Sequence, residues 1–143
     1  MPYEFVDERT VADIAFRAWG DDVEETFLAA ADAVMDAMVE DLRTILPQDT
    51  RTLNVEHEAL DLLLFNFLQE LVYYKDAEQL LLRVQQLHIA EGRQPYTLQA
   101  TAVGERIDPQ RHHMRVDVKA VTLHRFALTQ TESGWEATVI LDI

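Results

Sequence analysis

Hydrophobic and polar residues alternate at the start of the chain in the way that half-buried strands require. Residues 3–6 form a short candidate strand, and a polar turn is expected at residues 7–9. From residue 12 to residue 19 the apolar side chains Ile14, Phe16 and Ala18 fall on one face, and Gly20 ends the run. This two-residue period predicts a second strand.

Two later segments change to the spacing of three and four residues that is typical of an amphipathic helix. Asp21 or Asp22 is placed to cap the first helix, and Glu24 and Glu25 suit the positive end of its dipole. Its apolar stripe consists of Val23, Phe27, Ala30, Val34 and Met38. The second helix is predicted over residues 58–74, with a buried stripe of Leu60, Leu64, Phe67, Leu68 and Leu71.

The second half of the chain returns to strand patterns. Short strands are predicted at residues 53–56, 80–89, 96–103 and 135–143. Residues 114–128 alternate but change phase twice, which is explained by one long strand with β-bulges. Two helices and about seven strands predict an α+β fold. We expect one domain over residues 1–143, with two layers and the helices on one face of a largely antiparallel sheet.

The net charge narrows the choice of partners. The chain has 12 Lys and Arg against 26 Asp and Glu, a net of −14, and no cysteine. Residues 1–76 carry 5 basic and 18 acidic side chains, so the excess lies almost entirely there. Such a surface repels phosphate backbones, and direct binding to nucleic acid is not expected. A basic protein partner or cations would be attracted, although acidity that only maintains solubility explains the same numbers.

The sequence lacks the features of a signal peptide or a membrane span, and it also lacks common catalytic motifs. The first residues lack the basic and apolar regions of a signal peptide, and the apolar stretch 60–74 is interrupted by polar residues. We therefore expect a cytoplasmic protein that does not enter a membrane. The sequence contains no P-loop and no Ser-His-Asp spacing, and its four glycines leave little room for a phosphate-binding loop.

Several segments, taken in order, resemble the archease family. They include Tyr3-Glu4-Phe5-Val6, the Ala12-Asp13-Ile14 segment, the Ala-rich first helix and the run from Leu62 to Tyr74. Gly104-Glu105, the segment Val118-Lys119-Ala120-Val121-Thr122-Leu123-His124 and the final Leu141-Asp142-Ile143 follow. The resemblance covers essentially the whole chain. One difference is Thr10-Val11, where many archeases have His-Thr.

The resemblance implies a non-catalytic protein cofactor of an RtcB-type RNA-splicing ligase. That ligase joins 3′-phosphate or cyclic-phosphate RNA ends to 5′-hydroxyl ends through a guanylylated histidine, using GTP and a divalent metal. Members of the family promote guanylylation and multiple turnover. They also bind a divalent cation, often calcium, with Mg²⁺ or Mn²⁺ as alternatives.

The same resemblance assigns site residues. The cation ligands are Asp13, Asp142 and the main-chain oxygens of Ile143, including its carboxylate if the chain ends there. Hard cations prefer such oxygen ligands, although spacing alone favours a turn-capping carboxylate at Asp13 and a frayed chain-end carboxylate at Asp142. Glu105 is a weaker candidate for the same cation site.

Lys119 matches the family's lysine that is important for activating the ligase, and it would contact a nucleotide phosphate or a ligase carboxylate. Without the resemblance it would be an ordinary exposed lysine. His124, on the same segment, is a weaker candidate for a direct role.

Two other functions remain open from the sequence. A stand-alone metal-dependent hydrolase would use Asp13, Glu105 and Asp142 to hold its ion, but no nucleophile–base pair accompanies them. A general chaperone would need exposed apolar surface, and the regular patterning gives little sign of it.

Overall fold

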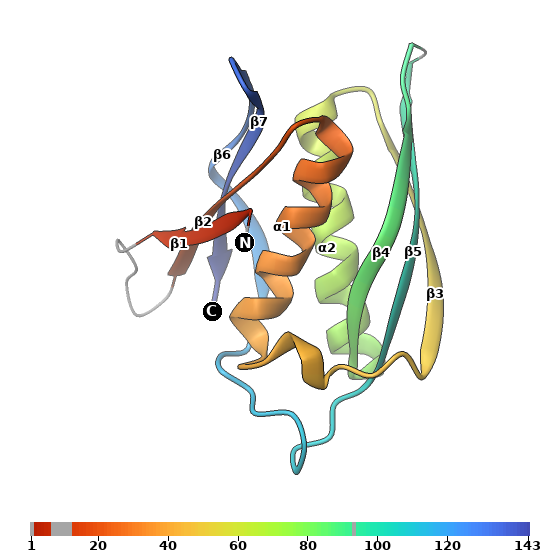
Figure 1. The fold of residues 1–143 in the computed structure, drawn as a ribbon, viewed down its shortest axis with the longest axis vertical. Coiled ribbons are helices and arrows are strands. Elements are labelled where there is room, and N and C mark those ends of the chain that lie inside the picture. The colour runs from red at the N-terminus through yellow and green to blue at the C-terminus, as the bar shows by residue number, and fades with distance from the viewer. Residues whose placement is uncertain (1, 7–12, 93) are drawn as a thin grey trace.

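The computed structural model describes residues 2–6, 13–92 and 94–143, and Figure 1 shows the course of the chain. Seven strands, two α-helices and one 3-10 helix are formed by these residues. In chain order they are β1 (Tyr3–Val6), β2 (Asp13–Gly20), α1 (Val23–Met38), η1 (Leu42–Thr44), β3 (Asp49–His57), α2 (Leu60–Glu78), β4 (Leu80–Ala90), β5 (Tyr96–Arg106), β6 (Ala120–Thr131) and β7 (Gly134–Asp142).

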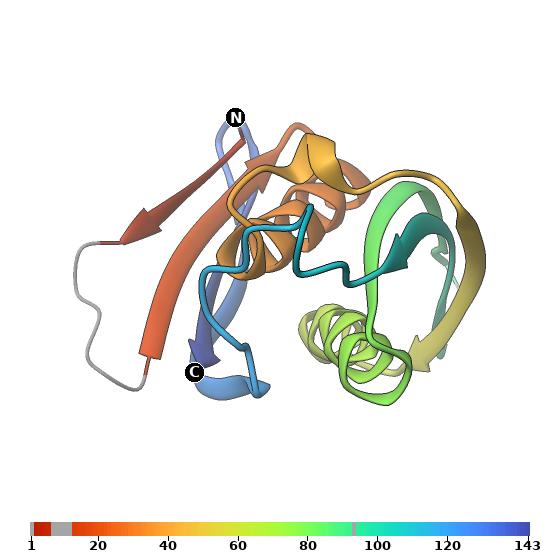
Figure 2. The ribbon, with the colours of Figure 1, turned by 90° about the horizontal axis from the view of Figure 1, so that it is seen from below.

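The strands form two antiparallel sheets, and the helices lie between them (Figures 1 and 2). One sheet has the order β1-β2-β7-β6 and the other β3-β5-β4. The α+β class and the two helices on antiparallel strands are confirmed. The expected single sheet is divided in two because the helices are apolar on more than one side. In α1, eleven of the sixteen residues are buried, which requires a partner on both faces.

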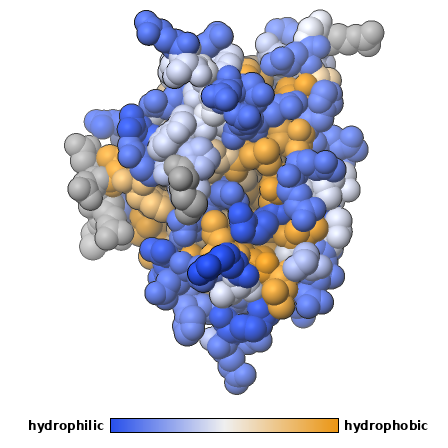
Figure 3. Space-filling view, viewed as in Figure 1, coloured by the Kyte–Doolittle hydropathy of each residue, from blue (hydrophilic) through white to orange (hydrophobic). Residues whose placement is uncertain are grey.

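The core is continuous from one sheet to the other through the helical layer. Phe27 of α1 and Phe67 of α2 stack with ring centroids 6.0 Å apart, and both side chains are fully buried. Figure 3 shows hydrophilic residues over most of one face, with apolar residues gathered toward its middle. The helical layer therefore joins the two sheets through one shared core.

The predicted cap of α1 is confirmed. The Asp22 carboxylate accepts a hydrogen bond from the N–H of Glu25 at 2.8 Å, and the Glu25 carboxylate accepts one from the N–H of Asp21 at 2.8 Å. These reciprocal bonds satisfy main-chain donors that a helix start leaves free. The helix start in turn fixes the end of β2.

The prediction of one strand over residues 114–128 is wrong in its first part. Met114 forms only an isolated bridge with Val39, and β6 begins at Ala120. The alternation before Ala120 reflects burial of Val118 in an extended segment whose main-chain groups bond elsewhere, including to a side chain of α2. The expected bulge is confirmed inside β6, where the register with β7 shifts between Thr122 and Ala127.

Several elements extend beyond their predicted limits, and the extension is three residues or more in β3, α2 and β5. Strand β3 is paired with β5 from Asp49 onward. Helix α2 continues to Glu78, and Gln79 ends it in the left-handed conformation with φ of 55°. This cap directs the chain back into β4. No helix among the described residues is long and apolar enough to cross a membrane.

Candidate functional site

The two aspartates assigned to the cation lie on adjacent strands. Asp13 opens β2 and Asp142 closes β7, and they are direct partners in the antiparallel register. Neighbouring Ile14 and Leu141 are buried in the core, so both aspartates face the side of the sheet away from the helices. Side chains of direct partners share one face and have Cβ atoms about 5 Å apart. The structure therefore brings the two carboxylates together.

Lys119 joins this group from a third segment. Its main-chain N–H donates a hydrogen bond to the carbonyl oxygen of Asp142 at 2.8 Å, directly before Ala120 pairs with the same residue in β6. Figure 2 shows the end of β7, marked C, beside the segment that enters β6. The Lys119 side chain is exposed, whereas Asp13 and Asp142 are half-buried. Ile143, also half-buried, follows directly.

The paired carboxylates suit a hard divalent cation. Calcium takes six to eight oxygen ligands, and two carboxylates with a main-chain oxygen and water can supply them. Among the described residues, no side chain donates a hydrogen bond to Asp13 or Asp142. Nor do those residues contain a cluster of three or more His, Asp or Glu side chains that could hold a metal. A cation here would rest on two carboxylates and main-chain or water oxygens.

His124 lies in the bulged part of β6, where its side chain is exposed. The bulge includes Arg125, whose φ of 53° is unusual for a residue other than glycine. Bulges redirect side chains, and Leu123 is left 59% exposed here. Residues 120–122, which pair with β7, and the start of the bulge separate His124 from Lys119, and no hydrogen bond or ion pair among the described residues joins His124 to the aspartates.

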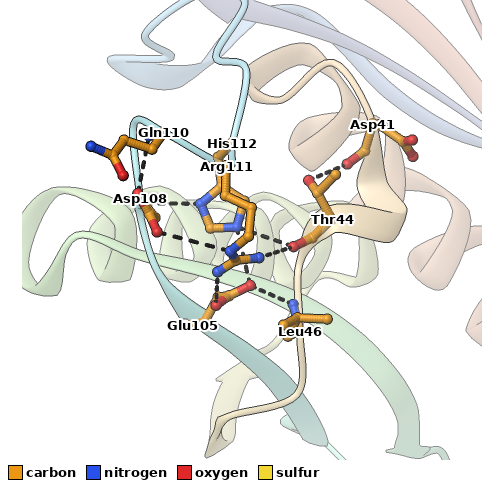
Figure 4. A network of polar contacts seen from close by, with 8 residues as sticks. All are labelled: Asp41, Thr44, Leu46, Glu105, Asp108, Gln110, Arg111 and His112. Carbon is orange, nitrogen blue, oxygen red and sulfur yellow. Dashed lines mark hydrogen bonds and ion pairs between the residues drawn. The ribbon is translucent and has the colours of Figure 1, made fainter.

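Glu105 does not join the aspartates. It lies on β5 of the other sheet, and its side chain is only 8% exposed (Figure 4). Its carboxylate forms an ion pair with Arg111, accepts the N–H of Leu46 at 2.6 Å, and lies 3.1 Å from Nε2 of His112. The preceding Gly104 is required because a Cβ there would overlap the main chain of β4. Glu105 thus belongs to a separate polar cluster.

Hydrogen bonds define the charge state of this second cluster. The Arg111 guanidinium, and then the hydrogen bonds from Leu46 and His112, outweigh burial and lower the pKa of Glu105 to about 2. Nδ1 of His112 accepts the N–H of Asp108 at 2.8 Å, so the ring proton of a neutral imidazole lies on Nε2. From there it is shared between Glu105 and the carbonyl of Thr44, which is 3.2 Å away. The cluster joins the segment after β5 to the segment after α1.

Sequence reasoning missed Arg111 and His112, which contact Glu105, and Lys75, whose ammonium bonds to the carbonyl of Val118 just before Lys119. Lys75 extends the buried stripe of α2 at the spacing Leu68, Leu71, Lys75, a signal that identifies it as buried. Arg111 and His112 gave no such signal, because they lie on an irregular segment. The Thr10-Val11 segment, where many archeases have His-Thr, lies outside the described residues.

Fold and site together define a small acidic α+β protein with two carboxylates paired at the ends of adjacent strands and an exposed lysine whose main chain bonds to one of these residues. The Archease protein family (MTH1598/TM1083) matches residues 3–143. This chain belongs to the archease family.

Curated relatives support the assignment over nearly the full length. One from Pyrococcus abyssi, named Protein archease, is 38% identical over 133 residues, which is 92% of this chain and 93% of the relative. Another of that name, from Methanosarcina mazei, is 32% identical over 144 residues, covering 99% and 95%. The name states no enzymatic activity.

Solved structures share the fold. The solution structure of protein 1598 from Methanobacterium thermoautotrophicum has a TM-score of 0.85 and 33% identity, covering 99% of both chains. A crystal structure from Thermotoga maritima, described as an archease and possible chaperone, has a TM-score of 0.66 and 16% identity over 96% of both chains. At that identity the second likeness shows the fold alone.

Proposed function

We propose that this protein is a non-catalytic activator of an RtcB-type RNA-splicing ligase in the cytoplasm. It promotes guanylylation and multiple turnover of the ligase, and it does so with a bound divalent cation, calcium being the first choice. The observation that carries the proposal is that Asp13, at the start of β2, and Asp142, at the end of β7, are direct partners, and that a main-chain bond of 2.8 Å ties Lys119 to Asp142.

Asp13, Asp142 and a main-chain oxygen of Ile143 would hold the cation. When bound, the cation supplies positive charge that offsets the repulsion between the two carboxylates. The chain's own residues position the site: β2 and β7 hold the aspartates in register, and the N–H of Lys119 holds the end of β7.

Lys119 carries the activating contact in this proposal. Its ammonium is exposed, and no ion pair among the described residues engages it. In the joint complex it would be desolvated against a nucleotide phosphate or a ligase carboxylate, a charge-assisted hydrogen bond. The net charge of −14 favours a basic protein surface over RNA as the direct partner.

The competing functions have less support. The hydrolase hypothesis needs Glu105 beside the two aspartates, and the structure places it on the other sheet in a complete hydrogen-bond network. The general chaperone hypothesis needs a broad apolar surface. The large exposed apolar residues among the described ones lie on separate elements: Phe5, Trp19, Leu46, Tyr73, Met114 and Leu123.

The test combines this protein with the RtcB-type ligase of its own organism, GTP and Mn²⁺. We expect a rise in guanylylated ligase and in joined RNA per ligase, and no joining by this protein alone. Unchanged guanylylation and turnover across a range of added protein would overturn the proposal. Cleavage of cyclic-phosphate RNA ends by this protein alone would favour the hydrolase instead. Suppressed aggregation of unrelated proteins, without stimulation of the ligase, would favour the chaperone.

A further inference from the structure

Helix α2 contributes a buried lysine to the segment that precedes β6. Lys75 is 3% exposed, and its ammonium lies against Asp117, 2.6 Å from the Asp76 carboxylate and 2.8 Å from the carbonyl oxygen of Val118. Lysine is rarely buried to this extent unless it is paired. The three acceptors match the three donors of an ammonium, so the group is fully satisfied.

Lys75 keeps its charge in this position. Burial is the largest single influence and lowers its pKa, but the hydrogen bonds to Asp117 and Asp76 together outweigh it, and the pKa is raised overall. The side chains of Asp117 and Asp76 are 72% and 56% exposed. These acids therefore stay hydrated, and the contact that is shielded from water is the one between Lys75 and the main chain of Val118.

A second side chain of α2, that of Gln69, bonds to the main chain on the C-terminal side of Lys119. Oε1 of Gln69 accepts the N–H of Val121 at 3.0 Å. Val118 and Val121 are both buried, and between them stands the exposed Lys119. Two polar contacts from one helix thus fix the main chain on either side of Lys119, while its own N–H is bonded to Asp142.

We propose that Lys75, together with Gln69, is a positioning residue for activation. The two side chains hold residues 118–121 on α2, and they thereby set where the Lys119 ammonium projects and where the end of β7 lies. This inference rests on the proposed activating role of Lys119. It goes further by assigning the geometry of the site to a helix that contributes no residue to the candidate site.

A purely structural role and a positioning role for Lys75 predict different effects of its replacement on stability and on activation. Removing one partner of a buried ion pair is destabilising when it leaves the other charge buried, but Asp117 and Asp76 are exposed and stay hydrated without Lys75. Lys75→Met should therefore leave the protein folded while it frees the carbonyl of Val118. Under the positioning role, activation falls much more than stability does. Under the structural role, both change together.

Amide hydrogen exchange tests the positioning without any ligase. In Lys75→Met we expect the Lys119 amide to exchange roughly tenfold faster than in the wild type, because its bond to Asp142 depends on the held segment. In Gln69→Leu the same is expected at the Val121 amide. Arg83→Met is the matched control, since it removes an ion pair with Asp32 at 3.0 Å between β4 and α1, far from this segment in the sequence. It should leave both amides protected.

Ligase stimulation gives the second readout. We expect Lys75→Met to reduce stimulation of guanylylation roughly tenfold even at saturating protein, Lys75→Arg to restore part of it, and Arg83→Met to leave it unchanged. Unaltered Lys119 exchange and full stimulation in a folded Lys75→Met would overturn the positioning role. If Lys75→Met does not fold, Gln69→Leu decides by the same two measurements. A wild type that fails to stimulate the ligase would refute the proposed function alone, since the exchange result stands by itself.

Discussion

Two acidic sites in this protein, on different sheets, are built in opposite ways. Glu105, on the three-stranded sheet, is buried and receives hydrogen bonds or ion pairs from Arg111, His112 and the main chain of Leu46. Asp13 and Asp142, on the four-stranded sheet, face each other half-buried. Among the described residues, no side chain donates a hydrogen bond to either of them.

The two arrangements suit different roles, one in the stability of the fold and the other in cation binding. A buried carboxylate that is fully hydrogen-bonded stabilises the fold and has no capacity left for a ligand. Two carboxylates held as direct strand partners repel each other until a positive charge arrives. The glutamate is accordingly expected to control stability, and the aspartates with Lys119 are expected to control cation binding and activation.

The largest expected effect is on activation. Lys119→Ala should lower stimulation of ligase guanylylation about tenfold to hundredfold, because a charge-assisted contact is worth roughly 1.5–3 kcal/mol. Exposed side chains contribute little to stability, so its thermal unfolding should change by under about 0.5 kcal/mol.

Arg125→Ala is the control for Lys119→Ala. Arg125 is also a cation exposed on the same stretch of chain, but it lies in the bulge of β6. Its loss should leave most of the stimulation. Equal stimulation by the wild type and a folded Lys119→Ala would reduce Lys119 to an ordinary surface residue.

The second largest expected effect is a loss of stability when Glu105 is replaced. Glu105→Gln should lower the free energy of unfolding by about 1–3 kcal/mol, since Arg111 loses its buried counter-charge. Denaturant unfolding measures this loss. Glu78→Gln is a matched control, because it weakens a surface pair with Arg51 that is worth under about 1 kcal/mol. A Glu105→Gln protein as stable as the wild type would show that the cluster adds nothing to the fold.

Acid titration measures how much the ionised Glu105 carboxylate contributes to stability. The pKa of Glu105 falls from its ordinary 4.5 to about 2 in the folded protein, chiefly through the hydrogen bond from Arg111. Its contribution is therefore complete above pH 4.5 and is lost as the pH falls from 4.5 toward 2. The stability of the wild type should decline more steeply across that range than the stability of Glu105→Gln. Parallel curves would contradict the assignment.

The smallest effect concerns the aspartates without metal. In chelator and low salt, Asp13→Asn should raise the free energy of unfolding by about 0.2–1 kcal/mol, because it removes a like-charge pair directly across two strands. Added salt should shrink the gain, since it screens the repulsion. A loss of stability under these conditions would mean that the two carboxylates do not repel each other.

Elements whose apolar residues recur at a regular spacing could be predicted from the sequence. Segments held by single polar contacts could not. The stripe beginning at Val23 located α1, and alternation around Phe16 located β2. Residues 114–119 carry the same alternation without forming a strand, because their main-chain groups bond to Lys75, to Met38 and to Asp142. Such partners are distant in sequence, and no local pattern reveals them.

The candidate site also contains residues that could be predicted from the sequence and others that could not. Asp13, Asp142 and Lys119 were selected by resemblance to a family, and the structure brings them together. Glu105 was selected in the same way, but Gly104 before it lies within β5, and its partners Arg111 and His112 come from an irregular segment. Whether an acidic residue is satisfied depends on tertiary contacts, which the sequence does not display.

Calcium titration by calorimetry tests the central contrast most directly. The wild type and Glu105→Gln should each bind one cation with similar affinity, whereas Asp13→Asn and Asp142→Asn should lose most of that affinity. Calcium at about one hundred times the dissociation constant should also stabilise the wild type by about 2.7 kcal/mol. Equal affinity in the wild type and Asp13→Asn, or loss of binding in a folded Glu105→Gln, would contradict the assignment of the cation to the paired aspartates.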